Sequence, residues 1–111
     1  MAIVYITQLP HRRDPTTGAL VPAFNVMTAN EFGTPHVLMP PQAPYTTVEF
    51  LMAQLRTALL HYDFAAGDSL LGLGDPVITA AAISILAVRG KFALLKWERN
   101  LGRYLRVVLY P

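Results

Sequence analysis

The longest apolar stretch of the chain lies in its second half and has two parts. Leu70 to Leu73 is apolar without alternation, which is typical of a strand covered on both faces. The run from Val77 to Val88 follows, interrupted only by Thr79 and Ser84. An apolar pattern of this kind predicts a helix that is buried on more than one side. We therefore expect a strand and a helix at the centre of the fold.

The ends of this helix carry residues that helix termini favour. Asp75 stands at the N-cap position, where its carboxylate can accept from the first free backbone N–H groups. Pro76 suits the first helical position because it has no N–H to lose there, and Gly90 predicts that the helix ends after Arg89. Lys91 to Glu98 then begins a new strand at once. The order strand, helix, strand predicts a parallel β-α-β unit with a right-handed crossover.

Three further segments show the composition or periodicity of strands. Arg103 to Tyr110 alternates between two sets of side chains and follows a tight turn at Arg99 to Gly102, which predicts a C-terminal β-hairpin that finishes as an edge strand. Ala2 to Leu9 is rich in β-branched and aromatic residues and predicts a first strand. His36 to Met39 is a shorter apolar run that fits another strand.

A second helix is indicated by apolar residues at helical spacing from Val48 to Tyr62. Thr46 to Glu49 has the form of a capping box at its start, and residues 63–68 are expected to close it and lead back into the sheet. Thr28 to Glu31 repeats the capping pattern before Gly33, which predicts one short helical turn.

The remaining connections are rich in proline and glycine. Pro10 to Gly18 reads as a turn, after which Ala19 to Ala23 can return as a short hairpin partner of the first strand. Pro40 to Pro44 predicts an extended linker. Together the elements predict a small single α/β domain over residues 1–111, with a mixed sheet of five to six strands and two main helices.

Composition narrows the class of protein. The chain has 111 residues, of which 53% are hydrophobic and 14% charged, so we expect one packed domain with an apolar-rich surface. The absence of cysteine excludes disulfides, thiolate nucleophiles and cysteine zinc sites. The N-terminus lacks the pattern of a signal peptide, and the apolar run 77–88 is too short to span a bilayer. We therefore expect a soluble intracellular protein that does not enter membranes.

Positive charge gathers near the C-terminus and gives the first candidate site. The predicted hairpin combines cations with aromatic rings, a composition that suits phosphate contacts and base stacking on single-stranded nucleic acid, or an acidic protein. The alternative is that the cations protect an edge strand from aggregation and that the tryptophan belongs to the core. The residues of this macromolecule-binding candidate are Lys96, Trp97, Arg99, Arg103, Tyr104 and Arg106.

The turn before the central helix gives a second candidate site. Gly72 and Gly74 precede a helix N-terminus, where backbone N–H groups and the helix dipole attract phosphate. However, Val77 stands where a dinucleotide fingerprint needs a third glycine, and Asp75 puts negative charge where phosphate would bind. A capped, tightly packed turn is the alternative to a small-ligand cleft at Gly72, Gly74 and Asp75.

Other residue types give weaker indications. His11 with Asp14, and His61 with Asp63, match no established metal-binding or catalytic spacing, and His36 begins a strand. We therefore assign no catalytic residue, metal ligand or cofactor, and an enzyme is disfavoured. The exposed part of the helix 77–88 is a further candidate surface, which either a second copy of the chain or other parts of the same chain would cover.

Several short motifs show a resemblance to a known group. They are residues 12–18 with 21–24, Glu31 to Gly33, Gly74 to Val77, and residues 94–99 with Arg103 and Tyr104. In these the chain resembles small uncharacterised accessory proteins of tailed bacteriophages. The resemblance implies a virus-encoded protein acting in the cytoplasm of an infected bacterium, and it carries no functional residue across.

These observations lead to three hypotheses of function. The first is a non-enzymatic phage accessory protein that binds a host or viral macromolecule as a protein-protein interaction module. The alternative is a nucleic-acid-binding protein that uses the basic hairpin. The third is a small-ligand site at the turn Gly74-Asp75.

Overall fold

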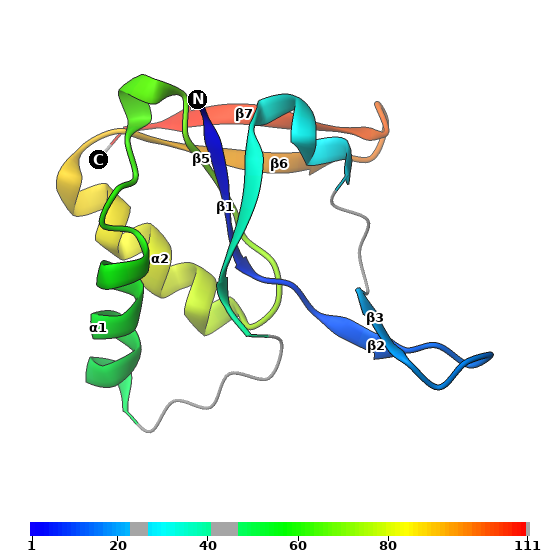
Figure 1. Cartoon of the computed structure of the whole chain (residues 1–111). Helices are drawn as coiled ribbons and strands as arrows, with labels where there is room; N and C mark the ends of the chain where they lie inside the picture. The colour runs from blue at the N-terminus through cyan, green and yellow to red at the C-terminus, as the bar shows by residue number, and fades with distance from the viewer. Residues whose placement is uncertain (23–26, 41–46, 111) are drawn as a thin grey trace.

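The computed structural model of the chain describes residues 1–22, 27–40 and 47–110. In this part of the chain a five-stranded mixed sheet is covered by two α-helices, and a separate two-stranded ribbon projects from one end (Figure 1). The predicted α/β fold with two main helices is confirmed. The elements are β1 (Ile3–Gln8), β2 (His11–Arg13), β3 (Leu20–Pro22), the 3-10 helix η1 (Met27–Phe32), β4 (Thr34–Met39), α1 (Val48–Ala58), the 3-10 helix η2 (Phe64–Ala66), β5 (Ser69–Leu71), α2 (Pro76–Arg89), β6 (Phe92–Glu98) and β7 (Arg103–Leu109).

The strands of the main sheet are arranged in the order β4-β1-β5-β6-β7. The first four are parallel, and β7 returns antiparallel to β6 from Glu98 opposite Arg103 to Phe92 opposite Leu109. The expected β-α-β unit and C-terminal hairpin are therefore confirmed. Only Leu70 and Leu94 are paired between β5 and β6 in the described chain, and Figure 1 shows the hairpin crossing the parallel strands steeply.

The two faces of the sheet bury different cores. On one face α1 and α2 pack through Leu51, Leu55 and Leu86 against Tyr5 and Leu70. On the other face η1 covers a smaller cluster formed by Val4, Ile6, Ala29, Leu71, Leu95 and Tyr104. The element η1, between β1 and β4, therefore lies on this second face, whereas α1, between β4 and β5, and α2, between β5 and β6, lie on the helix face. Connections that move in opposite directions along a sheet lie on opposite faces when all crossovers share one hand.

The central helix has the predicted caps. Asp75 Oδ1 accepts from Val77 N at 2.9 Å, Pro76 is the first helical residue, and Gly90 ends the helix. The prediction that α2 is buried on more than one side holds only in part. Its Ile78, Ala82, Ile85 and Leu86 are buried between the sheet and α1, but Val77, Ala80, Ser84 and Val88 form an exposed strip.

Two expectations for the N-terminal half are wrong. The strand that follows the first turn pairs with β2 in its own sheet, from His11 opposite Pro22 to Arg13 opposite Leu20, and not with β1. The two neighbours of β1 are instead β4 and β5, so its pairing is completed by segments remote in sequence. Residue Ala23 of the expected strand lies outside the described residues. Thr28 is inside η1 rather than at its N-cap, although Gly33 does follow the last turn.

The first helix is shorter than its apolar spacing predicts. It starts at Val48 with Thr47 as the cap, whose hydroxyl accepts from Phe50 N at 3.1 Å, and it ends at Ala58. Thr46 and most of the predicted linker lie outside the described residues. After Leu59 the chain leaves the helix. Tyr62 does not continue the helical face, and its hydroxyl instead donates to Asp68 O at 3.1 Å. The central strand β5 also ends early, at Leu71 rather than Leu73.

Candidate functional site

The predicted ligand cleft lies at the carboxyl ends of β1 and β5. Sheets with this strand order bind ligands in the crevice between two such strands, at the point where the chain reverses its direction across the sheet. Here the crevice is bridged by hydrogen bonds from the end of β1. Thr7 Oγ1 donates to Leu73 O at 2.7 Å and accepts from Leu73 N at 2.9 Å, and Gln8 Oε1 accepts from Asp75 N at 2.8 Å. The chain's own side chains therefore fill this crevice.

The two glycines of the turn serve packing. A Cβ atom at Gly72 would lie 2.6 Å from Thr79 Cγ2. Gly74 has a φ of +81°, and a Cβ atom there would collide with the Gln8 side chain. Both glycines thus allow close approach of neighbouring side chains, which favours the packed-turn interpretation over a phosphate-binding loop.

A surface pocket of about 410 Å³ adjoins this turn. Its lining is mainly apolar, and the Thr79 hydroxyl that it contains lies 3.2 Å from Thr7 Oγ1. The Asp75 carboxylate caps α2. The pocket therefore lacks the convergent polar groups that orient a ligand. It is lined by Gly72, Leu73, Gly74, Pro76, Thr79, Ala80 and Ile83.

The predicted basic surface of the hairpin is divided between the two faces of the sheet. Cross-strand partners share a face, so Trp97 and Tyr104 lie on the side of η1 together with Arg106, the partner of Leu95. Lys96 and Arg103 belong to the opposite set of alternating residues, although the long Arg103 side chain reaches Glu31 in η1, and Arg99 is in the connecting turn. The structure does not bring these six residues together on one surface.

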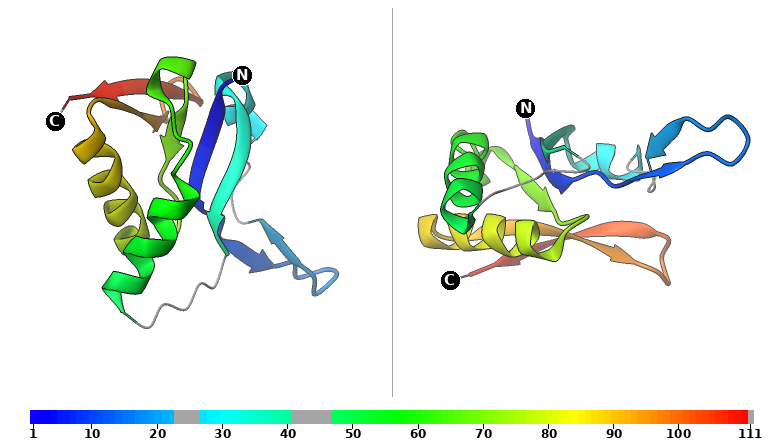
Figure 2. Two further views of the ribbon diagram at one scale, coloured as in Figure 1. Left: turned by 60° about the vertical axis from the view of Figure 1, so that its left-hand side comes forward. Right: turned by 90° about the horizontal axis from the view of Figure 1, so that it is seen from below.

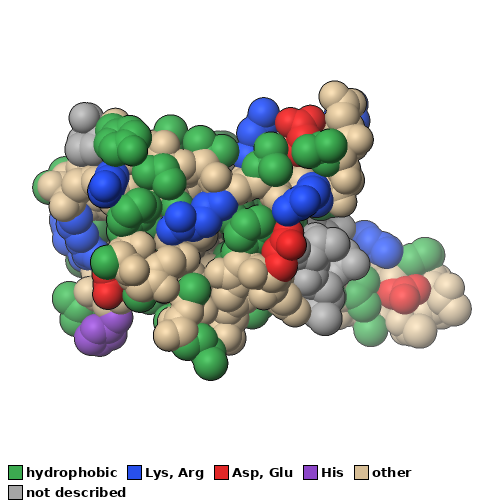
Figure 3. All heavy atoms as spheres, turned by 90° about the horizontal axis from the view of Figure 1, so that it is seen from above, with side chains coloured by type: hydrophobic (Ala, Val, Ile, Leu, Met, Phe, Trp, Pro, Cys, Tyr) green, Lys and Arg blue, Asp and Glu red, His purple; other side chains and the backbone are tan. Residues whose placement is uncertain are grey.

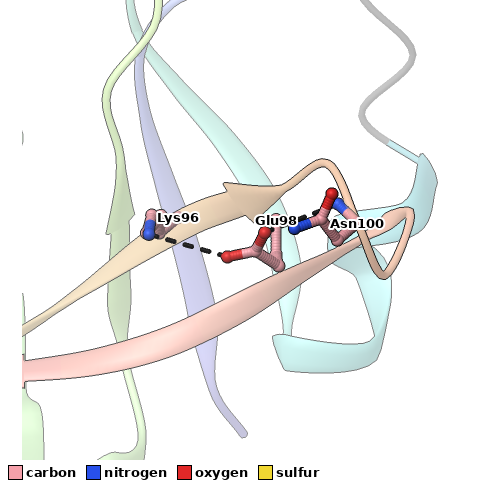
Figure 4. A network of polar contacts seen from close by, with 3 residues as sticks. All are labelled: Lys96, Glu98 and Asn100. Atoms are coloured by element: carbon pink, nitrogen blue, oxygen red, sulfur yellow. Dashed lines mark hydrogen bonds and ion pairs between the residues drawn. The ribbon is translucent and has the colours of Figure 1, made fainter.

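Two cations of the outer half of the hairpin, Lys96 and Arg103, have acidic partners. Lys96 Nζ lies 3.6 Å from Glu98 Oε2, and Asn100 N donates to Glu98 Oε1 at 3.4 Å, so the three residues form a short chain along β6 and its turn (Figure 4). Arg103 Nη2 lies 3.7 Å from Glu31 Oε1 in η1. These exposed ion pairs reduce the positive field that the outer half of the hairpin presents.

The aromatic residues and Arg106 mainly make contacts within the domain. Tyr104 is only 5% exposed, its ring centroid is 5.0 Å from that of Trp97, and burial raises its pKa. Trp97 itself is 48% exposed and keeps a free edge. Arg106 Nε donates to Ser69 Oγ at 2.9 Å and Arg106 Nη2 donates to Asp68 O at 3.1 Å. Of the predicted set, Lys96, Arg99 and Arg103 are the exposed cations, and Lys96 and Arg103 are engaged in ion pairs.

A basic pocket that the sequence did not indicate lies at the other end of the hairpin. This basic pocket has a volume of about 320 Å³ between η2, the last turn of α2 and the start of β6. Lys91 Nζ lies 5.4 Å from the centroid of the Phe64 ring and 5.8 Å from that of Tyr110, and Arg89 Nη1 donates to Leu59 O at 2.6 Å. The pocket is lined by Tyr62, Asp63, Phe64, Ala65, Leu86, Arg89 and Lys91.

A buried polar network supports this end of the sheet. Asp68 is 3% exposed, and its two carboxylate oxygens accept from Ile3 N and Asp63 N, each at 2.9 Å. Tyr62 donates to Asp68 O and accepts from Ala93 N at 3.1 Å. Burial raises the pKa of Tyr62, and the positive charge of Arg106 partly opposes this effect. Lys and Arg side chains lie among hydrophobic ones across the face seen in Figure 3.

The ribbon formed by β2 and β3 is a third candidate surface. It extends away from the sheet (Figure 2), and its strands make at most isolated contacts with other elements. The ribbon tip is nevertheless held by local bonds. Asp14 Oδ1 accepts from Thr16 N at 2.7 Å, Asp14 O accepts from Gly18 N at 2.8 Å, and Arg13 Nη1 donates to Gly18 O at 2.7 Å.

The histidines stay apart in the described structure. His11 Nδ1 lies 2.8 Å from Leu9 O, His36 packs edge-on against Tyr5 at 5.7 Å between ring centroids, and His61 is exposed. Within residues 1–22, 27–40 and 47–110, no three His, Asp or Glu side chains are grouped as a metal ion would require. In the same residues, no helix has the length and apolar character needed to cross a membrane.

Comparison with known proteins places the chain in a viral family. No curated protein and no solved structure matches it. Residues 2–111, nearly the whole chain, match the family model described as Phage Pam3 gp32-like protein. The resemblance to small phage proteins is thus confirmed, and the chain belongs to the Phage Pam3 gp32-like protein family.

Proposed function

We propose that this phage protein is a protein-binding module that docks onto a host or viral protein through the β2–β3 ribbon, in the cytoplasm of the infected bacterium. The observation that carries the proposal is that the ribbon projects from the domain and its strands make at most isolated contacts with other elements. A two-stranded hairpin is marginally stable by itself in water, so this ribbon gains little from its own fold. A partner would supply the missing packing.

The shape of the ribbon favours a protein over a small ligand. Small molecules bind in concave sites that surround them, whereas the ribbon is convex and exposes Leu20, which is 59% accessible. The local bonds of Asp14 stiffen the tip before binding. Such preorganisation lowers the entropy that docking costs.

The side chains of the ribbon also favour a protein over nucleic acid. Arg12 and Arg13 are exposed, but Arg13 is bonded to Gly18 O and Asp14 adds a negative charge beside them. The exposed apolar residue Leu20 stands opposite Arg13. A mixed apolar and polar surface of this kind fits a protein interface better than a phosphate backbone.

The test is affinity capture from lysates of infected and uninfected host bacteria, followed by mass spectrometry. A double variant with Arg12→Ala and Leu20→Ala should lose a protein that the wild type retains at near-physiological salt. Gln54→Ala, an exposed substitution on α1, is the matched control and should retain that protein. Equal retention by the double variant, or no retained protein in either lysate, contradicts the proposal.

Nucleic-acid binding by the hairpin is the competing function, and it needs a different variant from the one that the sequence suggests. Replacing Arg99, Arg103 and Arg106 together would also remove the bonds that Arg106 makes to β5. Arg99→Ala with Arg103→Ala leaves that link intact. A salt-sensitive gel shift with single-stranded DNA or RNA that this double variant loses would favour nucleic-acid binding, and no shift at low salt would exclude it.

A further inference from the structure

We propose that the basic pocket binds a small phosphomonoester whose phosphate is attached to a planar apolar group. The pocket is separate from the ribbon and from the six hairpin residues considered above, apart from the contact of Arg106 with Phe64. Its two cations are brought together by the fold from the end of α2 and the start of β6. Arg89 and Lys91 line it, and Arg106, which is not part of the lining, has its guanidinium carbon 5.3 Å from the centroid of the Phe64 ring.

The positive groups of the pocket are held in place without ion-pair partners. The two ion pairs of the described residues involve Lys96 and Arg103, and neither reaches the pocket. Arg89 uses one N–H on Leu59 O, which leaves its other donors available, and the Lys91 ammonium lies over the Phe64 and Tyr110 rings. Lys91 therefore keeps hydrogen-bond donors for a ligand.

The nearby carboxylates are already engaged with backbone groups. Asp63, which also lines the pocket, accepts from Ala65 N at 3.0 Å through Oδ1 and caps η2. Both oxygens of Asp68 accept from backbone N–H groups. Among the lining residues, Arg89 and Lys91 thus outnumber the single carboxylate of Asp63 and offset the negative end of the α2 dipole, so the two cations are suited to an oxyanion.

The walls of the pocket indicate what the phosphate would be attached to. Tyr62, Phe64 and Leu86 supply an apolar lining beside the cations. A volume of about 320 Å³ is within the range of sites that take small molecules. Because the lining combines cations with aromatic rings, the pocket should bind a phosphate joined to a flat group more tightly than inorganic phosphate.

The test uses phenyl phosphate as the probe, with isothermal titration calorimetry at low salt. The wild type should bind it more tightly than inorganic phosphate, and Lys91→Gln should weaken binding at least about tenfold, the effect of losing a charge-assisted hydrogen bond. Lys96→Gln is the matched control, because it removes an exposed lysine that is paired with Glu98. It should bind like the wild type.

The location and the fold are checked in the same series. Thermal unfolding of Lys91→Gln should match the wild type, because Lys91 is exposed and makes ring contacts only. Amide shifts in an NMR titration should centre on Gly90 and Lys91. Absence of saturable binding, equal weakening in Lys91→Gln and Lys96→Gln, or shifts centred on the turn at Gly74 would overturn the proposal. The ribbon variant with Arg12→Ala and Leu20→Ala should bind phenyl phosphate normally.

Discussion

The two ends of the parallel strands use their polar groups in opposite ways. At the carboxyl end, Thr7 and Gln8 bond to the backbone of Leu73 and Asp75 and close the crevice where sheets of this order bind ligands. At the amino end, Asp68 and Arg106 bind the strands together, yet Lys91 beside them keeps its donors for other partners. The comparison shows that strand order alone does not decide which end of the sheet stays open, because side chains can close the crevice.

The largest predicted effect is a loss of stability at the amino end of the parallel strands. Asp68→Ala should lower the free energy of unfolding by about 3 kcal/mol, because two backbone N–H groups lose their acceptor where Asp68 is buried. Asp14→Ala is the control, since Asp14 Oδ1 also accepts from two backbone N–H groups but at an exposed ribbon tip. It should cost about 1 kcal/mol or less. Equal losses in urea unfolding would contradict the assigned role of burial.

The next effect concerns the carboxyl end. Gly74→Ala should destabilise the protein by about 2 kcal/mol, because the new Cβ atom meets the Gln8 side chain and the φ of +81° is strained for alanine. Gly102→Ala has a φ of +61° with no atom within 4 Å of the added Cβ, so it isolates the strain. It should cost about 1 kcal/mol. If the two variants lose the same stability, the crevice is less tightly filled than its contacts indicate.

The elements that were predicted correctly depend on neighbouring residues. Asp75, Pro76 and Gly90 mark the ends of α2 by local chemistry, and the turn at Arg99 to Gly102 fixes the register of the hairpin. The same local reasoning failed for the ribbon, because Leu20 to Pro22 could pair with either earlier strand and the pairing of β1 was settled by β4 and β5.

The parts of the site that escaped prediction depend on distant residues. Thr7 meets Leu73 across 66 positions and Gln8 meets Asp75 across 67, so nothing near either residue reveals the bond. Phe64, Lys91 and Arg106 come together only when η2, β6 and β7 meet at one end of the sheet. Alternation along the hairpin could have shown that Trp97 and Lys96 point to opposite faces.

A smaller effect tests whether Asp75, at the carboxyl end of the parallel strands, acts as a helix cap or as a ligand-binding group. Asp75→Ala should lower stability by about 1 kcal/mol because Val77 N loses its acceptor, while Asp75→Asn should be nearly neutral since an amide oxygen also caps. Neither variant should change binding of phenyl phosphate. The measurements are thermal unfolding and calorimetry. If Asp75→Asn changes the binding of phenyl phosphate while stability is unaltered, the turn at Gly74 and Asp75 is again a candidate ligand site.

The smallest effect is seen only at alkaline pH and tests the amino end again. Burial raises the pKa of Tyr62 above the ordinary value of 10.0, so the folded protein holds this proton more tightly than the unfolded chain. The contribution of this raised pKa to the free energy of unfolding is therefore complete below pH 10 and is lost as the pH rises through the folded-state pKa of Tyr62. Burial also raises the pKa of Tyr5 and of Tyr104, so ionisation of these two residues adds to the loss of stability at alkaline pH.

The contribution of Tyr62 can be isolated by substitution. Tyr62→Phe should lower stability at neutral pH by about 1 kcal/mol, because Ala93 N and Asp68 O lose their partner. It should also make the fall in the free energy of unfolding above about pH 10 less steep than in the wild type. Urea unfolding across that range measures both quantities. Identical slopes for the two proteins would mean that Tyr62 ionises as readily in the fold as in the unfolded chain, and the amino end would then be more open to water than its hydrogen bonds imply.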